Sequence, residues 1–220
     1  MSVRAPVEFF PGLAKIDIIR HGFIQRIPGI DVSKDKAEAL KALDAVHRAA
    51  RREIEMADWP LLTAQQIHGD KIAVVDRAID RDHEFAGCDG LITNQRKLAL
   101  GIHVADCGAV YIVDPKMPAV GLIHSGKKGT ALAIAAKAIQ QMRERFGSRP
   151  EDLIVQLSPC IRPPHYEIDF AADIVEQCRA AGVKQIHDAG ICTACDLDRF
   201  YSYRAEKGKT GRMLALLGLT

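Results

Sequence analysis

The chain has 220 residues, of which 48% are hydrophobic and 26% are charged, and its formal net charge at pH 7 is +2. This composition suits a globular protein with a sizeable core, and the balanced charge argues against nucleic acid as the main partner. No stretch approaches the ~18 apolar residues of a membrane span, and Glu8 and Pro11 interrupt the segment where a signal peptide would be apolar. We therefore expect a cytoplasmic protein without a membrane partner, whose six cysteines stay as thiols.

The first part of the chain predicts one strand and one helix. Apolar and polar residues alternate at 15–20, which is typical of a half-buried strand, here ending at His21. From 33 to 58, apolar residues recur every three or four positions, which predicts an amphipathic helix with Ser33 as its N-cap. The Trp-Pro pair that follows ends this helix.

Two short apolar runs on either side of His68 predict a hairpin. The runs are 61–67 and 71–76, and the spacing puts His68 at the turn between them. The charged segment 77–86 then predicts a surface loop, and 91–93 predicts a further short strand.

The central part of the chain carries two reactive side chains at the ends of strands. Its three runs rich in β-branched residues predict buried strands at 98–104, 109–113 and 119–123. Cys107 follows the first run and His124 follows the third. A thiol and an imidazole therefore emerge where strands stop, which is where side chains from distant positions can gather.

The C-terminal half alternates helices with strands. Apolar spacing and closing glycines predict helices at 131–146 and 171–181, and a short one at 197–203. Strands are predicted at 153–157 and 212–217. Because hairpins and helical crossovers mix along the chain without a linker or repeat, we expect a single α+β domain over residues 1–220, a sandwich with mixed β-sheets.

Three side chains, those of His68, Cys107 and His124, each follow a predicted strand and can point into one cleft. Two imidazoles and a thiolate suit a catalytic Zn²⁺ with one open position, and they suit copper as well. The same residues suit a metal-free nucleophile, Cys107, with His124 as its base. Their spacing fits no local metal motif, so a buried cysteine with two hydrogen-bonded histidines is a further interpretation.

Several short motifs keep a common order along the chain: Gln65–Gly69, Cys88–Thr93, Ala105–Cys107, His124–Thr130, Tyr166–Glu167, Phe200–Arg204 and Thr210–Arg212. Together they resemble the laccase-domain family, whose members are also called polyphenol oxidoreductase or purine nucleoside phosphorylase proteins. The resemblance implies a four-layer α/β/β/α sandwich with a zinc site in a surface cleft. It also implies that His68, Cys107 and His124 are the metal ligands.

The same resemblance implies an enzyme with purine nucleosides and phosphate as its small-molecule substrates. It would be a zinc-dependent phosphorylase that cleaves adenosine- or inosine-type nucleosides, with adenosine deamination as a further activity. The family names also imply two alternatives, a copper-dependent polyphenol oxidase and a factor that edits peptidoglycan precursors. The eight scattered histidines are fewer than multicopper sites generally need.

The sequence departs from the family pattern near the expected cleft. Lys127 and Lys128 stand where the family usually has Trp-Arg, so a cation remains at Lys128 but a bidentate guanidinium is lost. The family's N-terminal loop is represented by 24–29, which contains Arg26. We expect Lys128 and Arg26 to bind phosphate and Tyr166 to bind the substrate by stacking.

Asp106 completes the expected catalytic set with Cys107, His124 and His68. It stands beside the thiol, where a carboxylate can orient a ligand or transfer a proton. Two interpretations need no metal chemistry: a hydrolase or deamidase built on Cys107 and His124, and a non-catalytic binding protein that kept the fold. The C-x-x-C at 192–195 is expected to be a pair of loop cysteines, and the residues indicate no oligomeric state.

Overall fold

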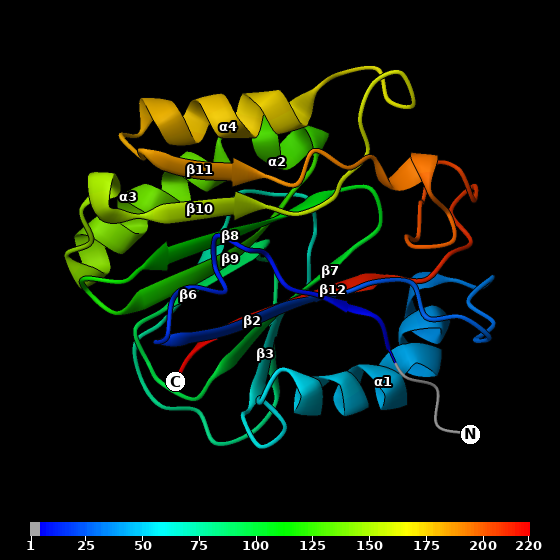
Figure 1. Cartoon of the computed structure of the whole chain (residues 1–220), viewed down its shortest axis with the longest axis horizontal. Coiled ribbons are helices and arrows are strands. Elements are labelled where there is room, and N and C mark those ends of the chain that lie inside the picture. Colours follow the sequence, from blue (N-terminus) through cyan, green and yellow to red (C-terminus); the bar gives the residue numbers. More distant parts are fainter. Residues whose placement is uncertain (1–4) are drawn as a thin grey trace.

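A computed structural model describes residues 5–220, which form two six-stranded β-sheets packed face to face (Figure 1). The first sheet has the order β1-β2-β12-β7-β3-β5, and the second has the order β11-β10-β8-β9-β6-β4. The strands of the first sheet are β1 Val7–Glu8, β2 Ile19–Ile24, β3 Leu61–Ala64, β5 His83–Phe85, β7 Ala99–Val104 and β12 Met213–Leu219. Those of the second are β4 Ile72–Val75, β6 Gly90–Thr93, β8 Gly108–Asp114, β9 Ala119–Ser125, β10 Ile154–Leu157 and β11 Gln185–Asp188.

Helices cover the outer faces of both sheets. Helix α1 (Lys36–Glu53) lies against the first sheet, whereas α2 (Lys127–Ala131), α3 (Ile134–Phe146) and α4 (Phe170–Ala180) lie over the second (Figure 1). Both sheets mix parallel with antiparallel pairs, for example β3 and β12 on the two sides of β7. The expected α/β/β/α sandwich with mixed sheets is confirmed. Among the helices of residues 5–220, none combines the length and hydropathy that a membrane crossing needs.

The central strands are continuous apolar runs because both of their faces are covered. All residues of β8, β9 and β12 are buried. One face of each sheet packs on the other sheet and the opposite face packs under helices, so the strands need no polar alternation. One core fills the space between the sheets, and a second lies between the second sheet and the helices α3 and α4.

The register between β8 and β9 positions the chemistry. In this antiparallel pair, Ala109 lies opposite His124 and Gly108 lies opposite Ser125. Cys107 therefore enters β8 beside the end of β9, next to Gly126. The sequence pattern predicts that His124 and Ser125 follow this strand. In the structure they are the last two residues of β9. The thiol and the imidazole are thus neighbours across two paired strands.

The predicted hairpin around His68 is wrong. Strand β3 pairs with β5 and β7 in the first sheet, whereas β4 pairs with β6 in the second, and all three pairs are parallel. His68 lies on the connection that crosses from one sheet to the other. A short apolar run predicts a strand but not its partner, because pairing depends on residues far away in the chain.

Helix boundaries also differ from the prediction. The first helix begins at Lys36 and not near Ser33, because the carboxylate of Asp35 caps it by accepting a hydrogen bond from the backbone N–H of Glu38 at 3.0 Å. The helix predicted at 131–146 is divided, since Ala133 adopts a left-handed conformation with φ 56° between α2 and α3.

Some expected elements are missing or displaced. The segment 197–203 forms turns and extended chain, and a short 3₁₀ turn lies before it at Thr193–Cys195. The first expected strand begins later, as β2, so His21 lies inside it and is buried. The sequence pattern predicted neither β5 nor β11, which are short edge strands with largely exposed residues.

Candidate metal centre

Three side chains from three separate parts of the chain converge at one site. His68 comes from the crossover between the sheets, Cys107 precedes β8 and His124 lies in β9. One ligand atom from each residue lies within 4.8 Å of the other two. The two imidazole rings meet edge to face, with their centroids 4.9 Å apart. The predicted convergence of these three residues is present in the structure.

Asp89, buried at the start of β6, holds both histidines in place. Its carboxylate accepts hydrogen bonds from the backbone N–H groups of His68 at 2.8 Å and Gly69 at 2.7 Å. It also bonds to Nδ1 of His124 at 2.8 Å, which leaves Nε2 of that ring to face Cys107 or an ion. A carboxylate behind a histidine fixes the orientation of the ring and raises its basicity as a ligand.

The backbone near the centre is also specialised. His68 and Asp106 both adopt left-handed conformations, with φ 62° and 81°, which non-glycine residues seldom do. Gly126 allows a close approach instead, because a Cβ at that position would overlap Sγ of Cys107. Any larger residue after the His124-Ser125 pair would push the thiol out of position.

Electrostatics favour a thiolate beside an imidazolium when no ion is bound. Burial would raise the pKa of Cys107, but hydrogen bonds and charge from His124 and His68 outweigh burial and lower it. Burial would lower the pKa of His124, but its bonds to Asp89 and Cys107 outweigh burial and raise it. The thiolate is already the form that ligates a metal or attacks a substrate carbon, and metal binding would displace the proton of the His124 ring.

The donor set fits Zn²⁺ or copper. Ligands that share one Zn²⁺ lie about 3–4 Å apart, given Zn–N distances of about 2.0 Å and Zn–S distances of about 2.3 Å. The three donor atoms here lie within 4.8 Å of one another, close to that spacing. Two imidazoles with one thiolate also match the borderline-soft character of both ions. His68 is exposed, so the fourth position would open to solvent.

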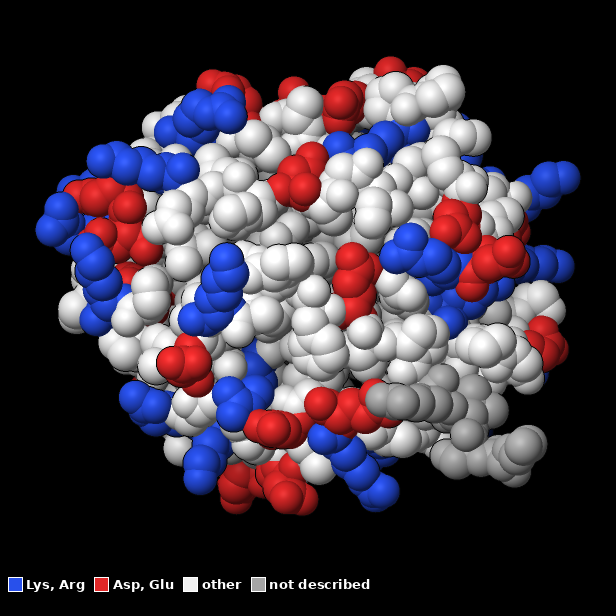
Figure 2. Space-filling view, in the orientation of Figure 1, with Lys and Arg blue, Asp and Glu red and all other residues white. Residues whose placement is uncertain are grey.

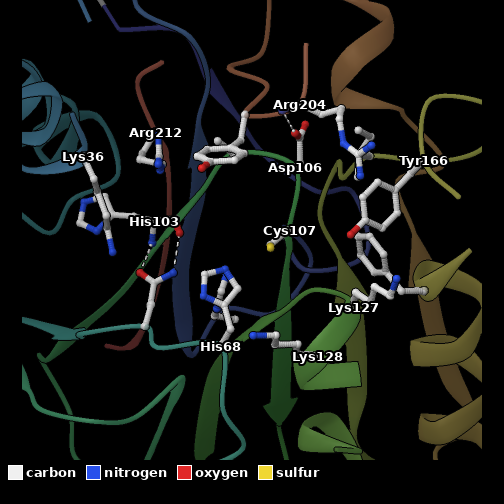
Figure 3. Close-up of a pocket in the computed structure, with 16 residues that line it drawn as sticks. Lys36, His68, His103, Asp106, Cys107, Lys127, Lys128, Tyr166, Arg204 and Arg212 are labelled. Atoms are coloured by element: carbon white, nitrogen blue, oxygen red, sulfur yellow. Dashed lines mark hydrogen bonds between the residues drawn. The ribbon is translucent and has the colours of Figure 1, made fainter. Parts of the chain in front are cut away.

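The centre lies in a cleft of about 500 Å³ with two different ends (Figure 3). Lys36, His103 and Arg212 lie on one side of His68 and Cys107, and Tyr166, Lys127 and Arg204 lie on the other (Figure 3). This volume falls within the range of small-molecule sites. On the face shown in Figure 2, cationic and anionic side chains intermingle, so that face carries no broad basic surface.

The structure places the expected substrate-binding residues differently. Lys128 and Tyr166 line the cleft. Arg26 is not among its lining residues: its guanidinium pairs with Glu206 at 2.6 Å, donates to the backbone oxygen of Phe200 at 3.0 Å and lies over the ring of Tyr201. Its contacts therefore support the segment beside the cleft.

Asp106 lines the cleft, but both of its carboxylate oxygens already accept hydrogen bonds. Oδ1 accepts from the hydroxyl of Thr193 at 2.8 Å, and Oδ2 accepts from the backbone N–H of Arg204 at 2.7 Å. Asp106, which precedes Cys107 in the chain, thus links the segments around Thr193 and Arg204 to the candidate site. These contacts suit a positioning role for its carboxylate.

Sequence reasoning missed Asp89 and Lys36. Asp89 stands inside one of the motifs quoted above, but its role rests on contacts with residues about twenty and thirty-five positions away. A buried acid between cysteine and glycine at the start of a strand was the available signal. No sequence signal pointed to Lys36, since it begins a helix that is far along the chain from the other cleft residues.

Comparison with known proteins identifies the family of the chain. The model of the family described as multi-copper polyphenol oxidoreductase laccase matches residues 25–173 and 164–220. Two bacterial relatives are named purine nucleoside phosphorylase YlmD. The protein from Geobacillus stearothermophilus is 32% identical over 210 residues, covering 76% of each chain. The protein from Bacillus subtilis is 27% identical over 228 residues, covering 87% of this chain and 81% of its own.

Solved structures share the fold. A crystal structure of YlmD from Geobacillus stearothermophilus aligns with a TM-score of 0.81 at 24% identity, covering 100% of this chain and 97% of that one. The hypothetical protein YfiH from Bacillus licheniformis aligns with a TM-score of 0.79 at 26% identity, covering 92% and 93%. With the family model spanning nearly the whole chain, this protein belongs to the laccase-domain, or polyphenol oxidoreductase, family.

Proposed function

We propose that this protein is a metal-dependent purine nucleoside phosphorylase that cleaves adenosine- or inosine-type nucleosides with phosphate, and that it also deaminates adenosine. The observation that carries the proposal is the convergence of His68, Cys107 and His124 on one side of a cleft large enough for a nucleoside. Relatives named purine nucleoside phosphorylase support the substrate class. We propose Zn²⁺ as the ion, with copper as the alternative.

The protein's own residues would prepare the centre for this chemistry. Asp89 orients His124, and the crossover that it also holds presents His68 on the open side of the site. A bound ion would supply a Lewis acid at the position facing the cleft. Burial raises the pKa of Cys107, but His124 and His68 lower it by more, which favours the thiolate.

The cleft walls would bind and orient the substrate. Phosphorolysis breaks the bond between purine and ribose through a cationic sugar, so phosphate must be held near the anomeric carbon. Lys128, which lines the cleft, is one proposed phosphate contact, and Arg26 would act by supporting the adjoining segment. Tyr166, edge to face with Phe170 at 5.8 Å, offers an aromatic wall for the purine.

A second candidate uses the same residues without a metal. Cys107 is hydrogen-bonded to His124, which is hydrogen-bonded to Asp89. Nucleophile, base and orienting acid therefore stand in the order of a catalytic triad. This arrangement favours a hydrolase or deamidase. It assigns no catalytic role to His68, whereas the metal-dependent proposal uses all three residues.

Metal analysis combined with a nucleoside assay separates the two candidates. The purified protein would be analysed for zinc and copper and then assayed with adenosine and inosine, with and without phosphate. The variant Cys107→Ser tests the centre, and Cys195→Ser, at an exposed cysteine outside the cleft, is its control. We expect a stoichiometric ion and phosphate-dependent release of purine, both lost in Cys107→Ser and both kept in the control.

Other outcomes would change the assignment. Turnover that survives complete removal of metal would favour the Cys107 nucleophile, because a dyad needs no ion. A stoichiometric ion without turnover of either nucleoside would favour a binding protein or another substrate.

A further inference from the structure

The end of the cleft next to α1 gathers positive charge from three distant parts of the chain. Lys36 is the first residue of α1, His103 lies in β7 and Arg212 precedes β12. All three line the cleft on the same side of Cys107 (Figure 3). Only the fold brings these residues together, and none of them has a role in the function proposed above.

Within residues 5–220, neither Lys36 nor Arg212 forms an ion pair. Nζ of Lys36 donates to the backbone oxygen of Gln65 at 3.4 Å. Nη1 of Arg212 donates to the backbone oxygens of Thr210 and Gly211, each at 2.8 Å. Backbone oxygens accept hydrogen bonds from both cations, while Glu84 and Asp89 near Lys36, and Cys107 and Asp106 near Arg212, act on them without forming an ion pair.

The opposite end of the cleft shows the contrast. There, the carboxylate of Glu167 accepts from Nζ of Lys127 at 3.2 Å and from Nη2 of Arg204 at 2.9 Å. Arg204 also lies over the ring of Tyr166, with its guanidinium carbon 4.8 Å from the ring centroid. The two cations of that end share one carboxylate, whereas no carboxylate of residues 5–220 pairs with Lys36 or Arg212, so an anion would be drawn to the α1 end.

The surroundings of the three residues give the same picture. Lys36 is exposed overall, yet partial burial of its ammonium lowers its pKa, the charge of Arg212 lowers it further, and Glu84 and Asp89 act in the opposite direction. Burial lowers the pKa of Arg212 as well. Burial first, and then the neighbouring His47, Lys36 and Arg212, lower the pKa of His103 to about 3, which leaves a neutral ring able to donate one N–H.

We propose that Lys36, Arg212 and His103 form a subsite for a phosphate group, at the end of the cleft opposite the aromatic wall of Tyr166. Two cations and a neutral N–H donor match the charge and the several acceptor oxygens of a phosphate. The subsite rests on the proposed function for its use: phosphate at one end and purine at the other would place the sugar beside the metal centre.

The phosphate group could belong to inorganic phosphate or to a nucleoside 5′-monophosphate, because both present the same dianion. Thermal unfolding of the purified protein, measured with inorganic phosphate, with adenosine 5′-monophosphate and with adenosine, distinguishes the two sources. This measurement does not depend on catalysis. It can therefore support the subsite even where phosphorolysis is absent.

The test variant is Lys36→Met, and its matched control is Lys41→Met, at an exposed lysine on the same helix that does not line the cleft. Arg212→Lys is a second test, which keeps the charge but removes the guanidinium that can donate two parallel hydrogen bonds. We expect at least about tenfold weaker phosphate binding in Lys36→Met, because one charge-assisted contact is lost. Adenosine binding and the control variant should be unchanged.

Each outcome decides the question. Stabilisation by either phosphate compound that requires Lys36 supports the subsite, and the compound that acts identifies the source. If phosphate binds in this way but no purine is released, the subsite stands and the proposed phosphorylase activity falls. Equal phosphate binding in Lys36→Met and Lys41→Met, or no phosphate binding by the unmodified protein, overturns the subsite.

Discussion

The candidate metal centre has a buried side and an exposed side, and the two are built differently. On the buried side, Asp89 and His124 are 0% and 3% exposed, and their contacts are fixed by the register of paired strands. On the exposed side, His68 stands on a crossover, and Lys127 pairs with Glu167 at the rim with about half of each side chain open to water. Under the proposed function, the buried side would set the geometry of the ion, while the rim would contact the substrate. Changes should therefore cost most where burial is greatest.

The largest effect is expected from Asp89→Ala. The substitution leaves the N–H groups of His68 and Gly69 without their acceptor and removes the partner of the buried His124 ring. Breaking a buried charged pair typically costs about 3–5 kcal/mol. Urea unfolding should show that the free energy of unfolding falls by this amount, and the amount of bound metal should fall with it.

Asp70→Ala is the control for that prediction, because the Asp70 side chain is 40% exposed and its partner is Lys137, whose side chain is 45% exposed. A stable, fully metal-loaded Asp89→Ala protein would contradict the view that Asp89 positions both histidines.

A smaller loss is expected from Gly126→Ala. The new methyl group would overlap Sγ of Cys107 and displace the thiol, and overpacking of this kind costs about 1–3 kcal/mol. Gly129→Ala is its matched control, since the nearest atom to a Cβ there is 3.4 Å away, in ordinary contact. Metal affinity and unfolding midpoint should both fall in Gly126→Ala alone; equal behaviour of the two variants would mean that the thiol has room to move.

The sequence predicts the buried side of this site better than its exposed side. The apolar runs around Cys107 and His124 predicted β7, β8 and β9, because strands covered on both faces are continuous apolar runs. The metal-ligand assignment came from the family resemblance, since the separation of the three residues in sequence matches no local motif. Asp89 had no assigned role, because four of its partners become neighbours only when two sheets have formed.

The exposed side was harder to predict for a physical reason. The runs beside His68 each fit a strand, but their own composition does not say that β3 and β4 enter different sheets. The segment 197–203 had helical spacing, yet hydrogen bonds to Asp106 and Glu206 hold the adjoining chain in turns. Long-range polar contacts outweigh local propensity in such connections.

The buried region extends to α1, where a pH effect of intermediate size is expected. The ring of His47 lies 6.0 Å from that of His103, its Nε2 has no hydrogen-bond partner, and burial lowers its pKa from 6.5 to about 4. Between these values the unfolded chain binds a proton that the folded chain does not, so stability is full above the unfolded pKa and declines as pH falls.

His47→Leu should remove that contribution. Between about pH 7 and about pH 5, the unmodified protein should lose about 2 kcal/mol more than the variant, from the change in one imidazole. Urea unfolding at both pH values measures the difference, and His83→Leu, at an exposed histidine of β5, serves as control. Parallel pH dependence in the unmodified protein and His47→Leu would show that His47 does not stay neutral.

The smallest effect is expected at the rim, from Glu167→Gln. The two ion pairs of Glu167, with Lys127 and Arg204, are half exposed, so the unfolding midpoint should not move measurably. The substitution frees two cations at the aromatic end and so weakens the charge difference between the two ends of the cleft. We expect the KM for phosphate to change by about twofold, with a stronger dependence on salt, because exposed charges are screened. A loss of stability approaching that of Asp89→Ala would mean that the rim, too, is part of the framework that holds the ion.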